Sequence, residues 1–120
     1  MKKIVAVDDN KMFIGTIKDF IQMQKDFECV TFTNPEEALE YILDNKDAYA
    51  VVSDYEMPKM DGLHLAKKII EENACSKIVI MSGHDTNYLK KKATEANLEV
   101  DKVYFLCKLN IINLPAILNS

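Results

Sequence analysis

The sequence predicts one α/β domain built on a parallel β-sheet. Two observations support this prediction: five short apolar runs alternate with segments of helical periodicity, and the connections between them are short. Runs this apolar indicate strands buried on both faces, as in sheets that helices cover on each side. The predicted strands are residues 3–7, 27–32, 49–52, 78–81 and 103–107.

A helix is predicted after each strand. Asp9 or Asn10 can cap the first helix, and Asn34-Pro35 begins the second with a capping residue followed by proline at the first helical position. Asn97 is a suitable left-handed residue to end the fourth helix. In the second helix Ala38, Leu39, Ile42 and Leu43 are expected to face inward, and in the first helix Phe13, Ile17, Phe20 and Ile21 lie on one face. The third helix carries Leu63, Ala66, Ile69 and Ile70, and the fourth runs through Tyr88, Leu89, Ala93 and Ala96.

The last helix is predicted to be short. Pro115 has no backbone N–H to donate, so it fits only in the first turn of a helix. A helix that begins near Asn113 has room for one or two turns before Ser120.

Five βα units leave few topologies, because crossovers between parallel strands are right-handed. The flavodoxin-like (βα)5 fold, with strand order 2-1-3-4-5, fits this pattern. In such a sheet the ligand crevice lies at the carboxyl ends of strands 1 and 3.

Polar residues follow four of the predicted strands at that edge of the sheet. They are Asp8-Asp9 after the first strand, Asp54 after the third, Ser82 after the fourth and Lys108 after the fifth. Three close carboxylates repel one another, and a divalent cation with a preference for oxygen ligands, such as Mg²⁺, relieves that repulsion. With a lysine and a hydroxyl nearby, these are parts for phosphoryl transfer. A capping role for Asp54 or Asp9 and a turn role for Ser82 remain open alternatives.

These residues belong to a larger set of motifs. Asp54 is followed by Met57-Pro58 and Asp61-Gly62, Ser82 is followed by Gly83, and Lys108 ends a strand that contains aromatic residues. With this set in this order, residues 1–120 resemble a receiver domain of the two-component response regulators, of the single-domain chemotaxis-regulator type.

The resemblance implies a phosphoacceptor and a metal site. Asp54 matches the aspartate that takes a phosphoryl group from a sensor histidine kinase or a phosphotransfer protein. Asp8, Asp9 and Asp54 match the acidic cluster that holds Mg²⁺, which also takes the backbone carbonyl of the residue that matches Glu56.

The resemblance also implies a conformational response. Ser82 matches the hydroxyl that binds the phosphoryl group, Lys108 the lysine that pairs with it, and Phe105 the aromatic residue that turns inward in response. Without the resemblance, Phe105 is an ordinary core aromatic residue. The downstream target is expected on the face formed by the fourth helix, fifth strand and fifth helix. The family usually has proline after the lysine, but here the residue is Leu109, so a trans Lys108–Leu109 bond is expected.

Composition narrows the remaining possibilities. The net charge of -4 argues against direct nucleic-acid binding, and no apolar stretch approaches the length of a membrane span. Three widely spaced cysteines in or next to apolar runs indicate buried thiols in a reducing compartment, so a cytoplasmic protein is expected.

Three function classes remain. The preferred one is a phosphorylation-driven switch that is not a turnover enzyme. The second is a Mg²⁺-dependent phosphohydrolase with Asp54 as nucleophile and Glu56 as acid/base, although the chain has no room for a substrate-covering cap. The third, a flavodoxin-like cofactor binder, lacks a Ser/Thr-rich phosphate loop after the first strand. His64 and His84 are predicted to lie at the surface, with His84 close enough to the crevice to contact hydrolytic water.

Overall fold

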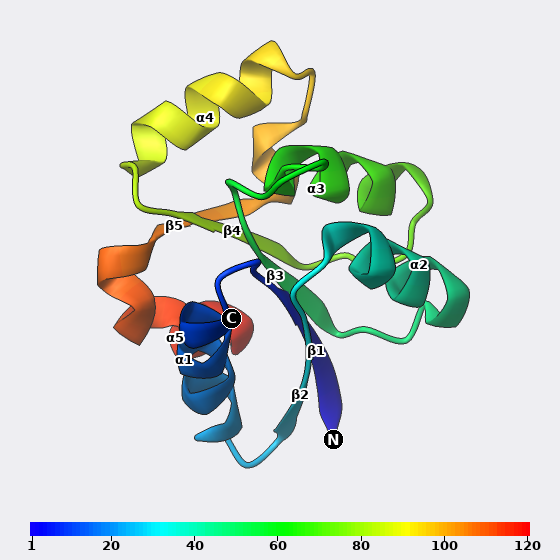
Figure 1. Ribbon diagram of the computed structural model, residues 1–120, viewed down its shortest axis with the longest axis vertical. Helices are drawn as coiled ribbons and strands as arrows, with labels where there is room; N and C mark the ends of the chain where they lie inside the picture. Colours follow the sequence, from blue (N-terminus) through cyan, green and yellow to red (C-terminus); the bar gives the residue numbers. More distant parts are fainter.

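The computed structural model describes residues 1–120 as a five-stranded parallel sheet with helices on both faces (Figure 1). The strand order is β2-β1-β3-β4-β5, which confirms the predicted flavodoxin-like topology. The strands are β1 (Lys2–Val7), β2 (Phe27–Phe32), β3 (Ala50–Asp54), β4 (Ile78–Ser82) and β5 (Tyr104–Cys107).

The helices form two layers (Figure 1). One face of the sheet packs against α1 and α5, and the other packs against α2, α3 and α4. The helices are α1 (Lys11–Gln22), α2 (Pro35–Asn45), α3 (Gly62–Glu71), α4 (Thr86–Glu95) and α5 (Leu114–Leu118), and two 3₁₀ helices are η1 (Val100–Lys102) and η2 (Lys108–Asn113). No helix has the length and apolar character that crossing a membrane requires.

The central strands are buried on both faces, as their apolar runs predict. In β1, Val5 and Val7 join the core beneath α2 and α3, whereas Ile4 and Ala6 join the core beneath α1 and α5. All four side chains are fully buried. Alternate residues of one strand therefore serve two separate cores.

Side-chain caps fix where the helices begin. The Asn10 side chain accepts hydrogen bonds from the backbone N–H groups of Met12 and Phe13, so Asn10 rather than Asp9 caps α1. Asn34 caps α2 as predicted. Asp61 and Asp85 cap α3 and α4 in the same way.

Helix α4 is the most polar helix and buries only Leu89 and Ala93. The Tyr88 side chain is exposed and packs on the loop after β4. Phe20 of α1 is only half-buried, because Ile14 takes the inward position beside Ile17. Asn97 has a φ of 60°, which confirms the predicted left-handed residue after α4.

The C-terminal segment follows the prediction that Pro115 implies. Helix α5 has five residues, with Pro115 in its first turn. Lys77, just before β4, donates hydrogen bonds to the backbone carbonyls of Ile117, Leu118 and Ser120 and so closes the end of α5. All peptide bonds are trans, including the bond that precedes Leu109.

Candidate functional site

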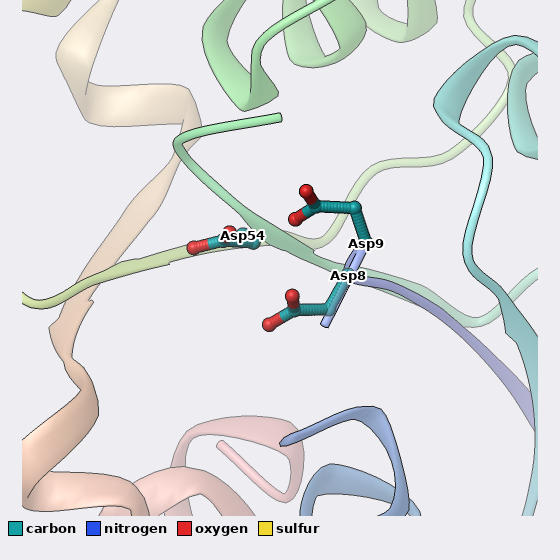
Figure 2. A group of neighbouring side chains, drawn as sticks. All are labelled: Asp8, Asp9 and Asp54. Atoms are coloured by element: carbon teal, nitrogen blue, oxygen red, sulfur yellow. The ribbon is translucent and has the colours of Figure 1, made fainter. Parts of the chain in front are cut away.

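Three carboxylates meet at the carboxyl ends of β1 and β3 (Figure 2). Asp8, Asp9 and Asp54 each offer an oxygen, and these oxygens lie within 4.8 Å of one another. Asp8 is fully buried, Asp54 is 6% exposed and Asp9 is open to solvent. The cluster therefore has two buried members and one at its mouth.

Local backbone contacts hold the two buried carboxylates. The N–H of Asp8 donates to the carbonyl of Phe32 on β2 at 3.1 Å, and the Asp8 side chain accepts from the N–H of Asn10 at 2.9 Å. Asp54 is the last residue of β3, and the N–H of the next residue, Tyr55, donates to the carbonyl of Met81 on β4. The strand pairing thus continues through the site.

Gly62 allows the loop after β3 to fold back against Asp54. A Cβ atom at position 62 would lie 2.4 Å from the Asp54 carbonyl oxygen, a distance that no side chain tolerates. The N–H of Gly62 donates to the carbonyl of Tyr55 at 2.8 Å. In the sequence Gly62 is visible only as part of a turn signal, and its contact with the backbone of Asp54 is a finding of the structure.

Lys108 reaches the cluster from the end of β5. Its Nζ lies 3.0 Å from Asp54 Oδ1 and 3.2 Å from Asp8 Oδ2. The same ammonium lies 4.4 Å from the centre of the Phe13 ring, a cation–π contact. Burial lowers the pKa of Lys108, but the hydrogen bonds and charges of Asp54 and Asp8 outweigh it, so that pKa is raised.

The electrostatics of the site favour a bound cation. Burial and the charge of Asp8 raise the pKa of Asp54 to about 6, against the opposing effect of Lys108. One ammonium leaves part of the negative charge of three carboxylates unbalanced. Neighbouring ligands of an octahedral Mg²⁺ lie roughly 3 Å apart, so three carboxylate oxygens within 4.8 Å of one another are close enough to share one ion. The donor set is all oxygen, which fits Mg²⁺.

Ser82 ends β4 beside this cluster and is 1% exposed. Its Oγ accepts a hydrogen bond from the N–H of His84 at 3.0 Å, and no hydrogen bond connects Ser82 to Asp54 or Lys108. Phe105, on β5, is half-buried and packs at the edge of the core beneath α3 and α4.

The Glu56 side chain does not join the carboxylate cluster. It is 66% exposed, and its Oε1 lies 2.8 Å from Nε2 of His84. His84 is at the surface, as predicted, but it is not isolated, because its ring also packs against Tyr88. Sequence reasoning missed this contact, since nothing in the spacing of the chain brings Glu56 and His84 together.

These residues provide the parts for moving a phosphoryl group. The buried carboxylate of Asp54 can act as an oxygen nucleophile, Lys108 and a hard cation can balance the negative charge, and Ser82 adds a hydroxyl.

Comparison with known proteins supports the same family. Residues 4–108 match the family model described as the response regulator receiver domain. A protein-glutamate methylesterase/protein-glutamine glutaminase from Syntrophomonas wolfei is 35% identical over 99 residues, which cover 82% of this chain and 26% of that protein. The chain spans between 14% and 35% of the length of the curated relatives that it matches.

Solved structures agree on the fold. The response regulator TrrA from Thermotoga maritima, in complex with Mg²⁺ and beryllofluoride, has a TM-score of 0.80 and 26% identity, covering 99% of this chain and 97% of its own. The chemotaxis protein CheY4 from Vibrio cholerae has a TM-score of 0.79 and 21% identity, with coverage of 99% and 97%. With its fold, its acidic cluster and a family match over most of its length, this chain belongs to the response regulator receiver domain family.

Proposed function

We propose that Asp54 accepts the phosphoryl group in this receiver domain, which comprises residues 1–120. The observation that carries the proposal is the contact of Lys108 with both Asp54 and Asp8, next to a third carboxylate at the mouth. With a pKa of about 6, Asp54 is largely ionised at neutral pH, as a nucleophile must be.

The donor is a phosphohistidine on a sensor histidine kinase or a phosphotransfer protein. An oxygen of Asp54 forms the new phosphorus–oxygen bond while the phosphorus–nitrogen bond of the donor breaks, and the electron pair stays on the imidazole nitrogen. Mg²⁺, held by the side chains of Asp8, Asp9 and Asp54 and by the backbone carbonyl of Glu56, would neutralise charge on the phosphoryl oxygens. Lys108 and Ser82 then bind those oxygens.

The response to phosphorylation is a change of surface. Movement of Ser82 towards the phosphoryl group and rotation of Phe105 would alter the face formed by α4, β5 and α5, where a downstream protein binds. The domain gains and loses one phosphoryl group in this scheme and does not turn over a substrate. A cytoplasmic location belongs to the proposal and is supported by three free cysteines, which suit a reducing compartment.

A phosphohydrolase is less well supported. Its second acid would stand two residues after the nucleophile, where Glu56 lies, but the Glu56 side chain is mostly exposed and bonded to His84. Steady release of phosphate from small phosphomonoesters would favour that alternative.

Intact-mass measurement after treatment with acetyl phosphate and Mg²⁺ tests the proposal. One phosphoryl group should appear on the parent protein and on Asp101→Asn, which removes an exposed carboxylate on η1, far along the chain from the cluster. Neither Asp54→Asn nor Asp9→Ala should be labelled. Labelling of Asp54→Asn at the parental rate would show that another residue is the acceptor.

A further inference from the structure

A group of four side chains connects the loop after β3 to the loop after β4, beside the proposed phosphoacceptor. His84 Nε2 lies 2.8 Å from Glu56 Oε1, and the centre of its ring lies 4.3 Å from that of Tyr88. Tyr88 in turn makes an edge-on contact with Tyr55 at 6.3 Å between ring centres. We call these residues, Tyr55, Glu56, His84 and Tyr88, the His84 clasp.

The clasp joins three parts of the molecule that the proposed function uses. Tyr55 and Glu56 directly follow Asp54, and Tyr88 belongs to the first turn of α4. These contacts border an open hollow between the two loops. The loop after Asp54 and the start of α4 are thus held together through the His84 ring and through the direct contact of Tyr55 with Tyr88.

The backbone of His84 is also the partner of Ser82. Its N–H donates to Ser82 Oγ at 3.0 Å, and Ser82 is almost completely buried. His84 therefore binds the Ser82 hydroxyl through its backbone N–H and contacts Glu56, in the loop after β3, through its ring. The ring needs no positive charge for this contact, because the Nε2–H of a neutral imidazole can donate to Glu56.

We propose that His84 is a positioning residue for Ser82, and that the clasp opposes the movement of the Ser82 hydroxyl towards a phosphoryl group on Asp54. This inference rests on the proposed function. If the hydroxyl turns towards Asp54, it either gives up the hydrogen bond from His84 or draws the His84 backbone with it. In the second case the ring must leave Glu56 or Tyr88. The first route costs the hydrogen bond from the His84 N–H, and the second costs a contact of the His84 ring. The clasp therefore favours the unphosphorylated arrangement by hindering the second route.

The expected effect is modest, because the clasp is partly open to solvent. The His84 and Glu56 side chains are 48% and 66% exposed. Exposed pairs of this kind change an equilibrium constant by about two- to fivefold. Removing the clasp should therefore tighten binding of a phosphoryl mimic by about two- to fivefold.

Equilibrium binding of beryllofluoride in the presence of Mg²⁺, followed by ¹⁹F NMR, tests this inference. His84→Ala keeps the backbone N–H that donates to Ser82, and Glu56→Ala keeps the backbone carbonyl that would hold the metal. Each variant should bind beryllofluoride more tightly than the parent protein. The double variant should bind no more tightly than His84→Ala, since the two side chains act through one contact. In the unliganded variants, the Ser82 amide signal should shift towards its position in the beryllofluoride complex.

His64→Ala is the matched control. His64 forms a similar exposed contact with a carboxylate, 2.9 Å from Asp61, and has no hydrogen bond to Ser82. Its affinity for beryllofluoride should equal that of the parent. If His84→Ala does not fold by circular dichroism, Glu56→Ala decides the question alone.

The outcomes separate the clasp from the function on which it rests. If both clasp variants bind beryllofluoride with the affinity of the parent, the positioning role is overturned, even if acetyl phosphate labels them faster. Side chains that merely cover the site would change the labelling rate and leave the equilibrium constant for beryllofluoride unaltered. Weaker binding in both variants would overturn the positioning role as well. Failure of the parent protein to bind beryllofluoride would count against the proposed function itself and remove the basis of the clasp.

Discussion

Replacement of Asp54 by asparagine is expected to stabilise the metal-free protein at neutral pH. Folding raises the pKa of Asp54 from an ordinary 3.8 to about 6, because the carboxylate is buried and lies beside Asp8. At about 1.36 kcal/mol for each pKa unit, the charged carboxylate lowers the free energy of unfolding by about 3 kcal/mol. Asparagine keeps the shape of the side chain and removes that charge.

The dependence on pH has a definite sign. Below pH 3.8 the carboxyl group is protonated in both the folded and the unfolded state, so it carries no penalty. As the pH rises from 3.8 to about 6, the unfolded chain releases its proton first and the folded state loses relative stability. The advantage of Asp54→Asn should therefore be small near pH 4 and reach its full value above pH 6.

Urea denaturation and thermal scans in the presence of a chelator measure this difference. A gain of about 3 kcal/mol corresponds to a rise in Tm of roughly 10 °C for a domain of this size. The control Asp101→Asn removes an exposed carboxylate and should change stability by less than about 0.5 kcal/mol. A variant no more stable than the parent at pH 7, or equally favoured at pH 4 and pH 7, would refute the reasoning.

Three further predictions concern the same site. Mg²⁺ at ten times its dissociation constant should stabilise the parent protein by about 1.4 kcal/mol and should leave the stability of Asp9→Ala unchanged. Thermal scans with and without the ion measure this difference, and equal shifts in Tm for both proteins would exclude Asp9 as a ligand. Gly62→Ala should lower the free energy of unfolding by about 1–3 kcal/mol in urea, because its Cβ meets the carbonyl of Asp54; parental stability would contradict that contact. Lys108→Ala should destabilise the metal-free protein at pH 7, and Mg²⁺ should reduce that loss of stability. The loss should be smaller than the about 3–5 kcal/mol of a fully buried pair, because the Lys108 side chain is 24% exposed. No loss in the presence of a chelator would show that the contacts of Lys108 with Asp54 and Asp8 contribute nothing to stability.

The fold could be predicted from the sequence because its signals are local and agree with one another. Apolar runs with polar residues at their ends predict buried parallel strands, and they also place Asp54 and Lys108 at one edge of the sheet. Pro115 predicts the short α5 for an equally local reason, its missing N–H. The convergence of the carboxylates follows from strand order alone.

What could not be predicted depends on contacts between loops. The exposed Tyr88 ring packs against His84 of the loop after β4, and no spacing in the sequence indicates that contact. The sequence of η2 carries no hydrophobic repeat that would indicate a 3₁₀ helix. Asp9 and Asn10 are both good capping residues, and only the path of the chain after β1 selects Asn10.

The sparse packing of α4 has a consequence for hydrogen exchange. Its anchors are Leu89 and Ala93, and burial of one leucine is worth about 1.5–3 kcal/mol. Local opening of α4 should therefore cost only a few kcal/mol, well below a global free energy of unfolding of about 5–15 kcal/mol. Amide protons of α4 should exchange through this local opening, whereas those of β3 and β4, whose residues are all buried, should wait for global unfolding. The helix that begins at the His84 clasp can thus be displaced at a much lower cost than the central strands beneath it.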